Sequence, residues 1–209
     1  MPVQQWFVFD LGNVVVKLNY ERVLQRILAL APTTNRDRLM SVMEGAGGYR
    51  DLERGQVTFT EFYEFLRDSS GYLGTIGSLR ETWMDFFDGP VEGIEDVLER
   101  VRKAYRVAYA SNSNEIHAEY IPRQFAPLFR REERFIFSHL HKCAKPDRVF
   151  FERTLNVLGS LAHHLVFVDD LLENVVAARD LGIRAYQFRD SISLVETLET
   201  DGLLTPVEG

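Results

Sequence analysis

The sequence predicts an α/β fold in which helices flank a parallel β-sheet and a helical bundle is inserted after the first strand. Four short apolar runs, at residues 6–9, 107–110, 135–137 and 165–168, lead to this prediction. Their continuous hydrophobicity is typical of parallel strands that are buried on both faces. Segments with helical spacing of apolar residues separate the last three runs. A longer segment with the same spacing separates the first run from the second.

The N-terminal segment begins with the first predicted strand, at residues 5–10, which are apolar, aromatic and β-branched. A glycine–asparagine turn follows, and residues 14–16 are expected to form a short extended piece. Apolar residues then recur three and four positions apart over residues 20–28. This spacing places them on one face of a helix, which should end before Pro32.

The inserted segment, residues 19–90, is rich in aromatic residues and contains no predicted strand of real length. A second helix is expected from about residue 35 to residue 44, and a glycine-rich stretch breaks it. Thr58 and Glu61 have the spacing of a capping box, which marks the start of another helix. A last helix is expected to carry Leu79, Trp83, Phe86 and Phe87 and to end at Gly89-Pro90.

After residue 90 the predicted helices and strands alternate. Strands are expected at residues 105–111, 134–138, 165–169 and 184–188. Helices are expected at residues 94–101, 115–122, 147–158, 172–181 and 191–200. We therefore predict an α/β core domain made of residues 1–18 and 91–209, with residues 19–90 as a helical cap domain. The cap would lie over the carboxyl ends of the strands.

The composition favours a globular protein that acts on a small molecule. The chain has 209 residues, of which 45% are hydrophobic, and its formal net charge is -7. An acidic protein is a poor partner for nucleic acid or an anionic membrane, and no apolar run is long enough to span a bilayer. A single cysteine excludes an internal disulfide, and residues 1–5 lack the basic start of a signal peptide. We expect a cytoplasmic protein, either a monomer or a weak homodimer.

Residues suited to phosphate chemistry follow these apolar runs. Asp10 follows the first run, Ser111 the second and the pair Asp169-Asp170 the fourth, while Lys145 comes soon after the third. Because ligands bind outside the carboxyl ends of parallel strands, we expect these side chains to converge. A carboxylate and a phosphate dianion repel by roughly 4 kcal/mol per close charge pair at an effective dielectric near 20. Mg²⁺ held by Asp10 and Asp170, together with Lys145, would offset this repulsion.

Four motifs make a family recognisable in this chain. They are Phe9-Asp10-Leu11-Gly12-Asn13-Val14-Val15, Ala110-Ser111-Asn112-Ser113-Asn114, Lys145-Pro146, and Phe167-Val168-Asp169-Asp170 with Asn174. In this order, with a helical segment after the first motif, the chain resembles the haloacid dehalogenase (HAD) superfamily of aspartate-nucleophile phosphatases over nearly its whole length. The resemblance implies a HAD-like fold with a Rossmann-like core, and Mg²⁺ as the cofactor.

The resemblance also implies roles for individual residues. Asp10 would be the nucleophile and would form a phosphoaspartyl intermediate. Ser111 and Asn112 would bind the phosphate, and Lys145 would stabilise it. Asp170 would bind Mg²⁺ together with Asp10 and the main-chain carbonyl of Gly12. Asp169 would support these groups from behind or replace one of the metal ligands. Asn174 and His117 would also support them from behind.

Gly12 departs from the family pattern, which has an aspartate there as general acid and base. Glycine keeps the carbonyl but cannot transfer a proton, and general acid catalysis is worth about 10²–10⁴ in rate. In this glycine, in residues Ser111 to Asn114 and in His117, the chain is similar to a subgroup of the family that acts on glucose 1-phosphate-type substrates. An anomeric phosphate has a more acidic leaving group than an ordinary alcohol, so we hypothesise that it needs less help from an acid. Breakdown of the intermediate would still need a base, from His117 or another group.

Several of these residues also have simpler structural interpretations. Asp10 alone would fit a turn, and Asp170 would fit the N-cap of the helix starting at Leu172. His117 is expected on a helix surface rather than in catalysis, and Cys143 is expected to be a small packing residue. Most cap aromatics are expected in the bundle core rather than in a sugar pocket, namely Tyr49, Phe59, Phe62, Tyr63, Trp83, Phe86 and Phe87.

We therefore predict a Mg²⁺-dependent phosphatase whose partner is a small phosphorylated metabolite, with a sugar phosphate as the favoured substrate. Two alternatives stay open. A 2-haloacid dehalogenase of the same superfamily needs no metal, but the pair Asp169-Asp170 would then repel Asp10 without a balancing cation. A weakly active phosphate-binding or regulatory protein is the second alternative, because Gly12 replaces the usual general acid.

Overall fold

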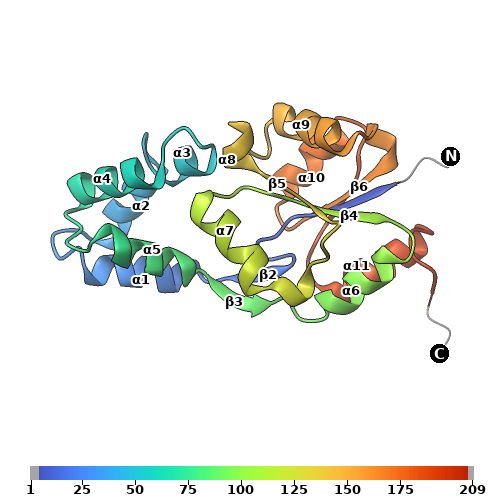
Figure 1. The fold of residues 1–209 in the computed structure, drawn as a ribbon, viewed down its shortest axis with the longest axis horizontal. Helices are drawn as coiled ribbons and strands as arrows, with labels where there is room; N and C mark the ends of the chain where they lie inside the picture. The colour runs from blue at the N-terminus through green and yellow to red at the C-terminus, as the bar shows by residue number, and fades with distance from the viewer. Residues whose placement is uncertain (1–4, 207–209) are drawn as a thin grey trace.

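A computed structural model describes residues 5–206 and confirms the predicted α/β class (Figure 1). Its centre is a five-stranded parallel sheet with the strand order β5-β4-β1-β6-β7. Residues 1–4, which carry part of the expectation about a signal peptide, and residues 207–209 lie outside the described residues. The strands are β1 (Trp6–Phe9), β4 (Arg106–Ser111), β5 (Arg134–Phe137), β6 (Leu165–Asp169) and β7 (Arg184–Gln187).

Helices connect these strands and lie on both faces of the sheet (Figure 1). Within residues 5–206, no helix has both the length and the apolar character needed to cross a membrane. The helices that follow the cap are α6 (Ile94–Arg102), α7 (Glu115–Gln124), α8 (Ser138–His141), α9 (Arg148–Leu158), α10 (Leu172–Arg179) and α11 (Ser191–Thr200). Short 3-10 turns occur at Ala126–Leu128 and Ala162–His164.

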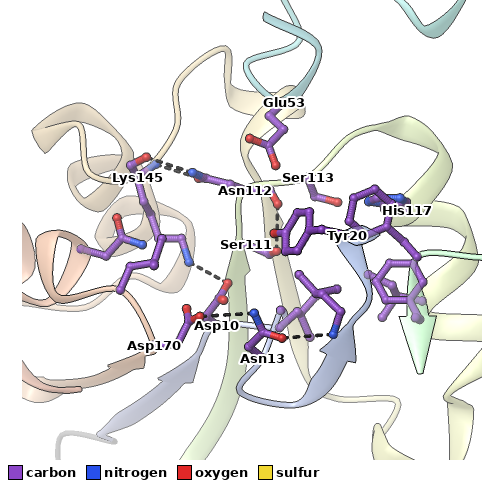
Figure 2. Close-up of a pocket in the computed structure, with 18 of the residues that line it drawn as sticks. Asp10, Asn13, Tyr20, Glu53, Ser111, Asn112, Ser113, His117, Lys145 and Asp170 are labelled. Carbon is purple, nitrogen blue, oxygen red and sulfur yellow. Dashed lines mark hydrogen bonds and ion pairs between the residues drawn. The ribbon is translucent and has the colours of Figure 1, made fainter. Parts of the chain in front are cut away.

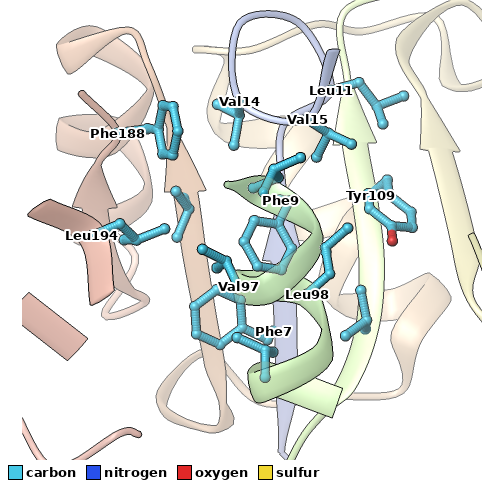
Figure 3. Packing of buried hydrophobic residues seen from close by; sticks show 14 of the residues in the cluster. Phe7, Phe9, Leu11, Val14, Val15, Val97, Leu98, Tyr109, Phe188 and Leu194 are labelled. Atoms are coloured by element: carbon cyan, nitrogen blue, oxygen red, sulfur yellow. The ribbon is translucent and has the colours of Figure 1, made fainter. Parts of the chain in front are cut away.

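The alternation of side chains along β1 builds one hydrophobic core on each face of the sheet. Phe7 and Phe9 belong to the core under α6 and α11, which Figure 3 shows from close by. Trp6 and Val8 belong to the core under α9 and α10 on the opposite face. All four side chains are buried, which explains why the run is hydrophobic without a break.

The inserted segment forms a helical bundle at one end of the molecule (Figure 1). Phe59, Phe62 and Trp83 are buried in its core, as the helical spacing predicted. The capping box also forms, because Thr58 and Glu61 each accept a hydrogen bond from the other's backbone N–H. The helices of the bundle are α1 (Tyr20–Ala29), α2 (Arg36–Glu44), α3 (Tyr49–Glu53), α4 (Phe59–Ser70) and α5 (Ile76–Met84).

The prediction for the end of the cap was wrong. Helix α5 stops at Met84, and strand β3 (Phe87–Pro90) pairs antiparallel with β2 (Val16–Leu18). Phe86 and Phe87 have helical spacing in the sequence, but the backbone of Phe87 belongs to this two-stranded ribbon. The boundaries predicted at residues 18/19 and 90/91 fall where β2 and β3 end, so this ribbon is the double connection between sheet and cap.

Smaller differences concern three other segments. The extended piece expected at residues 14–16 is a turn, and β2 begins only at Val16. Helix α3 follows Gly48 and was not predicted. Pro122 lies inside α7, which continues to Gln124 instead of ending at the proline. A proline this close to a helix end removes a hydrogen-bond donor without stopping the last turn.

Candidate active site

Three neighbouring strands bring the predicted residues to one rim, as Figure 2 shows. Strands β4, β1 and β6 are adjacent and parallel, so their carboxyl ends lie side by side. Asp10 directly follows β1, Ser111 ends β4 and Asp169 ends β6. A cavity of about 260 Å³ opens at this rim, and its core side is lined by Asp10, Gly12, Ser111, Asn112, Lys145, Asp170 and Asn174.

Lys145 is buried between two carboxylates rather than solvated. Its Nζ lies 2.7 Å from Oδ1 of Asp10 and 2.6 Å from Oδ2 of Asp169. Burial works to lower the pKa of Lys145, but the negative charges of Asp10 and Asp169 raise it above its ordinary value. The ammonium group therefore stays charged at neutral pH.

Asn112 holds the backbone of Lys145 in place. Its side-chain Oδ1 accepts a hydrogen bond from the Lys145 N–H at 2.8 Å, and its Nδ2 donates to the Lys145 carbonyl at 2.9 Å. The side-chain amide of Asn112 is therefore engaged in positioning Lys145. A phosphate group would have to meet the main-chain N–H of Asn112 instead.

Asp169 is saturated with hydrogen bonds, which favours a supporting role over a direct metal ligand. Its Oδ1 accepts from the Leu171 N–H at 2.9 Å and from Nδ2 of Asn174 at 2.8 Å, while its Oδ2 faces Lys145. Asn174 is 2% exposed and so fixes the Asp169 carboxylate from behind. The supporting role expected from the sequence for Asp169 and Asn174 stays a prediction, for which these contacts leave room.

Asp10 and Asp170 keep oxygen atoms available for a cation. Oxygens of Asp10, Asp169 and Asp170 lie within 4.8 Å of one another. Among residues 5–206, no hydrogen bond between residues engages Oδ2 of Asp10, and Oδ2 of Asp170 accepts only a long one, of 3.4 Å, from Asn13. Asp170 does not cap α10, whose N-cap is Leu171, so the simpler interpretation of Asp170 was wrong.

The acidic groups at this rim carry more negative charge than Lys145 balances. Burial raises the pKa of Asp10 to about 7, and Asp169 adds to the rise while Lys145 opposes it. Burial and the charge of Asp169 also raise the pKa of Asp170. A divalent cation would supply the missing positive charge and lower both pKa values. Carboxylate and carbonyl oxygens are ligands that suit Mg²⁺.

Gly12 lies in the turn after β1, and the space where its side chain would extend is occupied. The turn is closed by hydrogen bonds from the Val16 N–H to the Leu11 carbonyl and from the Asn13 N–H to the Val16 carbonyl. These bonds do not use the Gly12 carbonyl, which is what a metal ligand requires. A Cβ at Gly12 would lie 2.7 Å from Cδ1 of Leu18.

Gly12→Asp is therefore expected to destabilise the protein only modestly, by about 1 kcal/mol, because the new side chain must displace the end of the flexible, half-buried Leu18 side chain. Combining it with Leu18→Ala should recover part of that loss. Urea unfolding of both variants and of Leu18→Ala alone measures the coupling. Additive effects in the double variant would show that Leu18 is not the obstacle.

His117 is buried, which corrects the prediction that it lies on a helix surface. Its Nε2 lies 3.1 Å from the Trp83 carbonyl and its Nδ1 lies 3.2 Å from Nδ2 of Asn114. Phe86 and Phe87 pack edge-on against its ring. Burial lowers the pKa of His117 to about 4, and the hydrogen bond to Trp83 only partly opposes this. With both nitrogens engaged, His117 cannot supply the missing base.

The burial of neutral His117 predicts a loss of stability in acid. The pKa of His117 is about 4 in the folded protein and 6.5 in the unfolded chain, so between these pH values the unfolded chain binds more protons. The free energy of unfolding therefore falls as the pH drops through that range. We expect about 2 kcal/mol to be lost from this group between pH 7.5 and pH 5. Urea unfolding at both pH values should show a smaller loss for His117→Gln than for the wild type. Equal losses would contradict the assignment.

The cap contributes residues to the cavity that the sequence did not identify as part of a site. Tyr20, Tyr49 and Glu53 line it from α1 and α3, and Phe86 and Phe87 line it from the segment after α5. The prediction that most cap aromatics lie in the bundle core is confirmed, since Phe59, Phe62, Trp83 and Phe86 are buried there, although Phe86 also lines the cavity together with Tyr49 and Phe87. Glu53 was missed entirely, because only the packing of the cap against the core reveals it.

Two sequence comparisons bear on this site. The model of the family described as haloacid dehalogenase-like hydrolase matches residues 5–182 of the chain. Among curated proteins, the chain is similar to a D-ribitol-5-phosphate phosphatase of Bacteroides thetaiotaomicron. The two are 24% identical over 185 residues, which is 86% of this chain and 89% of that protein.

Solved structures share the fold. A HAD family enzyme from Bacteroides thetaiotaomicron, in complex with magnesium and inorganic phosphate, matches with a TM-score of 0.76 and 23% identity, over 90% of this chain and 95% of that one. An L-2-haloacid dehalogenase from Xanthobacter autotrophicus, with chloropropionic acid covalently bound, matches with a TM-score of 0.60 and 14% identity. That match covers 98% of this chain and 85% of the dehalogenase.

Proposed function

The chain belongs to the haloacid dehalogenase-like hydrolase family, and from that premise we propose that it is a Mg²⁺-dependent phosphoric monoester hydrolase. The proposed substrate is a small phosphorylated metabolite of the sugar or polyol phosphate class. The observation that carries the proposal is that Asp10, Lys145 and Asp170, which are far apart in the chain, line one cavity. The chain is similar to a ribitol phosphate phosphatase and to an enzyme solved in complex with magnesium and phosphate, and both similarities support the same activity.

In the proposed reaction, a carboxylate oxygen of Asp10 attacks phosphorus in line with the leaving oxygen. The new bond makes a phosphoaspartyl intermediate, and water then cleaves it to release inorganic phosphate. Lys145 fixes Asp10 through its 2.7 Å contact and stays charged while negative charge develops on the phosphoryl oxygens. Asn112 and Asp169 act on this step by holding Lys145 in place.

Mg²⁺ would be held by Asp10, Asp170 and the carbonyl of Gly12, and when bound it would neutralise charge on the phosphate oxygens. The Ser111 hydroxyl and the main-chain N–H of Asn112 would hold further phosphate oxygens at the same rim. Ser111 lines the cavity and donates a 3.2 Å hydrogen bond to the Asn112 carbonyl, which a phosphate oxygen would replace.

The cavity favours a small substrate. Its volume of about 260 Å³ lies below the range of about 300–1,000 Å³ that holds drug-sized ligands. Tyr20, Tyr49 and Phe87 supply aromatic walls on the cap side, against which the carbon face of a sugar or polyol would pack. A substrate of a few carbon atoms plus one phosphate group therefore fits this space best.

Removal of the metal tests this proposal against the dehalogenase alternative. We expect EDTA to lower the hydrolysis of sugar and polyol phosphates by more than about 10²-fold, since a metal supplies several kcal/mol of charge stabilisation, and added Mg²⁺ to restore it. A panel of phosphorylated metabolites, assayed in parallel with 2-chloropropionate, separates the two activities. Chloride release that survives EDTA, without phosphatase activity, would establish the dehalogenase instead.

Isothermal calorimetry tests the regulatory alternative, which Gly12 supports. Saturating Mg²⁺ and a sugar phosphate should give turnover heat that continues after each injection. Binding heat without product formation would favour a phosphate-binding protein.

A further inference from the structure

Glu53 lies at the end of cap helix α3 and faces the cavity opposite the strand ends. Figure 2 shows its carboxylate directed from the cap toward the region of Asn112 and Ser111. Asp10, Asp170 and Glu53 are the carboxyl groups that line this cavity among residues 5–206. The first two belong to the floor and have roles in the proposed function. Glu53 is the one that approaches from the side on which the leaving group must lie.

We propose that Glu53 is the general acid and base of the reaction, in the role that Gly12 cannot perform. The inference rests on the proposed phosphatase activity and extends it to the proton transfers. Gly12 has no side chain, and Leu18 occupies the space beside it. A carboxyl group that reaches the leaving oxygen from the cap would supply the missing proton from the other side of the cavity.

The other proton-transfer candidates around the cavity are engaged or have unsuitable pKa values. Both ring nitrogens of His117 are hydrogen-bonded, and its pKa is lowered to about 4. Desolvation at the cavity and the negative charge of Glu53 raise the pKa values of Tyr20 and Tyr49 above their ordinary value of 10, which makes them weak acids at neutral pH. Lys145 is held charged by Asp10 and Asp169.

The surroundings of Glu53 tune it for proton transfer near neutrality. Burial raises its pKa to about 7, against the lowering effects of the Tyr49 hydroxyl and of the positive charges of Lys145, Arg50 and Arg54. General acids and bases work best when their pKa lies near the operating pH, because both protonation states are then populated. Glu53 meets this condition while lining the same cavity as the nucleophile.

Hydrogen bonds between cap and core set the position of the Glu53 backbone. The Ser138 hydroxyl donates to the Glu53 carbonyl and accepts from the Ser113 N–H at 2.8 Å. Ser113 belongs to the loop that begins with Ser111, so one serine links the backbone of Glu53 to the predicted phosphate-binding loop. Two further links flank the same segment: Arg54 pairs with Asp147, and the Lys142 ammonium donates to the Gly55 carbonyl.

The two proton transfers balance over one cycle. Protonated Glu53 gives its proton to the leaving oxygen while the P–O bond breaks and the Asp10–P bond forms. The resulting Glu53 carboxylate takes a proton from a water molecule, whose oxygen attacks phosphorus as the Asp10–P bond breaks. Inorganic phosphate leaves, and Glu53 is protonated again.

Glu53→Gln, compared over substrates with different leaving groups, tests the proposal. For a sugar or polyol phosphate we expect kcat/KM to fall by about 10²–10⁴-fold, because an alkoxide needs a proton to leave. For 4-nitrophenyl phosphate, whose leaving group needs none, kcat/KM should stay within about threefold while kcat falls, giving a burst of nitrophenol as phosphoenzyme accumulates. For phenyl phosphate, kcat/KM should fall at least about tenfold. Because this substrate has no sugar hydroxyl group that Glu53 could bind, such a loss reports proton transfer rather than substrate binding.

The matched control is Glu64→Gln, which makes the same chemical change at an exposed position of α4. Wild-type kcat/KM for phenyl phosphate should also decline above about pH 7, and Glu53→Gln should lack this decline. Equal losses of kcat/KM for all three substrates, or no loss for any, would overturn the role of Glu53. Absence of wild-type phosphatase activity would instead overturn the proposed function, so the two failures are distinguishable.

Discussion

Asp10→Asn is expected to lower kcat for phosphate monoester hydrolysis by about 10⁴-fold or more, because the carboxamide cannot act as the nucleophile. The substitution should not destabilise the fold. Burial and Asp169 raise the pKa of Asp10 to about 7, so its charged form is costly in the metal-free protein. Lys145 would keep Asp169 as its partner at 2.6 Å. The melting temperature of the metal-free variant should therefore equal or exceed that of the wild type.

Asp96→Asn is the matched control, since it makes the same change at an exposed position of α6. It should leave both kcat and the melting temperature unchanged. Turnover by Asp10→Asn within tenfold of the wild type would contradict the assignment of the nucleophile. A loss of activity accompanied by unfolding would leave Asp10 as a structural residue, against the expected separation of activity and stability.

Lys145→Met is expected to damage both stability and activity. The substitution keeps much of the side-chain volume but leaves Asp10 and Asp169 facing each other without their buried cation. Breaking a buried ion pair in this way typically costs about 3–5 kcal/mol. The loss of one preorganised charge at the phosphoryl group should also lower kcat by about 10²–10³-fold. Urea unfolding and steady-state kinetics measure the two effects.

The pH dependence of this variant gives an internal check. Without Lys145, protonation of Asp10, whose pKa burial already raises, relieves its repulsion with Asp169, so the stability deficit relative to the wild type should shrink as the pH is lowered. Lys103→Met, at an exposed position after α6, is the control and should behave as the wild type. A stability deficit below 1 kcal/mol at pH 7.5 would contradict the account of Lys145 as the balancing charge.

The sheet and its rim were predictable because the relevant signals are local. Strands β1 and β6 are buried on both faces, so each appears in the sequence as an uninterrupted apolar run, and the residue after the run marks the rim. Parallel pairing then requires Asp10, Ser111 and Asp169 to meet, whatever the sequence distance between them. Lys145 was placed at the rim because it comes soon after the third apolar run, and the family resemblance gave it the role of stabilising the phosphate.

The cap side was less predictable because its features depend on tertiary packing. Phe87 has helical spacing, but pairing with Leu18 draws it into a strand. His117 is a polar residue on a helix, and only the approach of Trp83 buries it. Glu53 stands among charged residues that are typical of a solvated helix, and only the packing of the cap against the core, where Ser138 binds the Glu53 carbonyl, makes it line the cavity. No local pattern encodes these contacts.

Trapping of the phosphorylated enzyme tests the central claim most directly. Radiolabelled 4-nitrophenyl phosphate mixed with the enzyme and Mg²⁺ would be quenched in acid during turnover, and the labelled peptide would be identified by mass spectrometry. We predict one phosphoryl group on the peptide that contains Asp10, with none in Asp10→Asn and a higher level in Glu53→Gln. Label on another residue, or steady turnover that leaves Asp10 unlabelled in Glu53→Gln, would contradict the account.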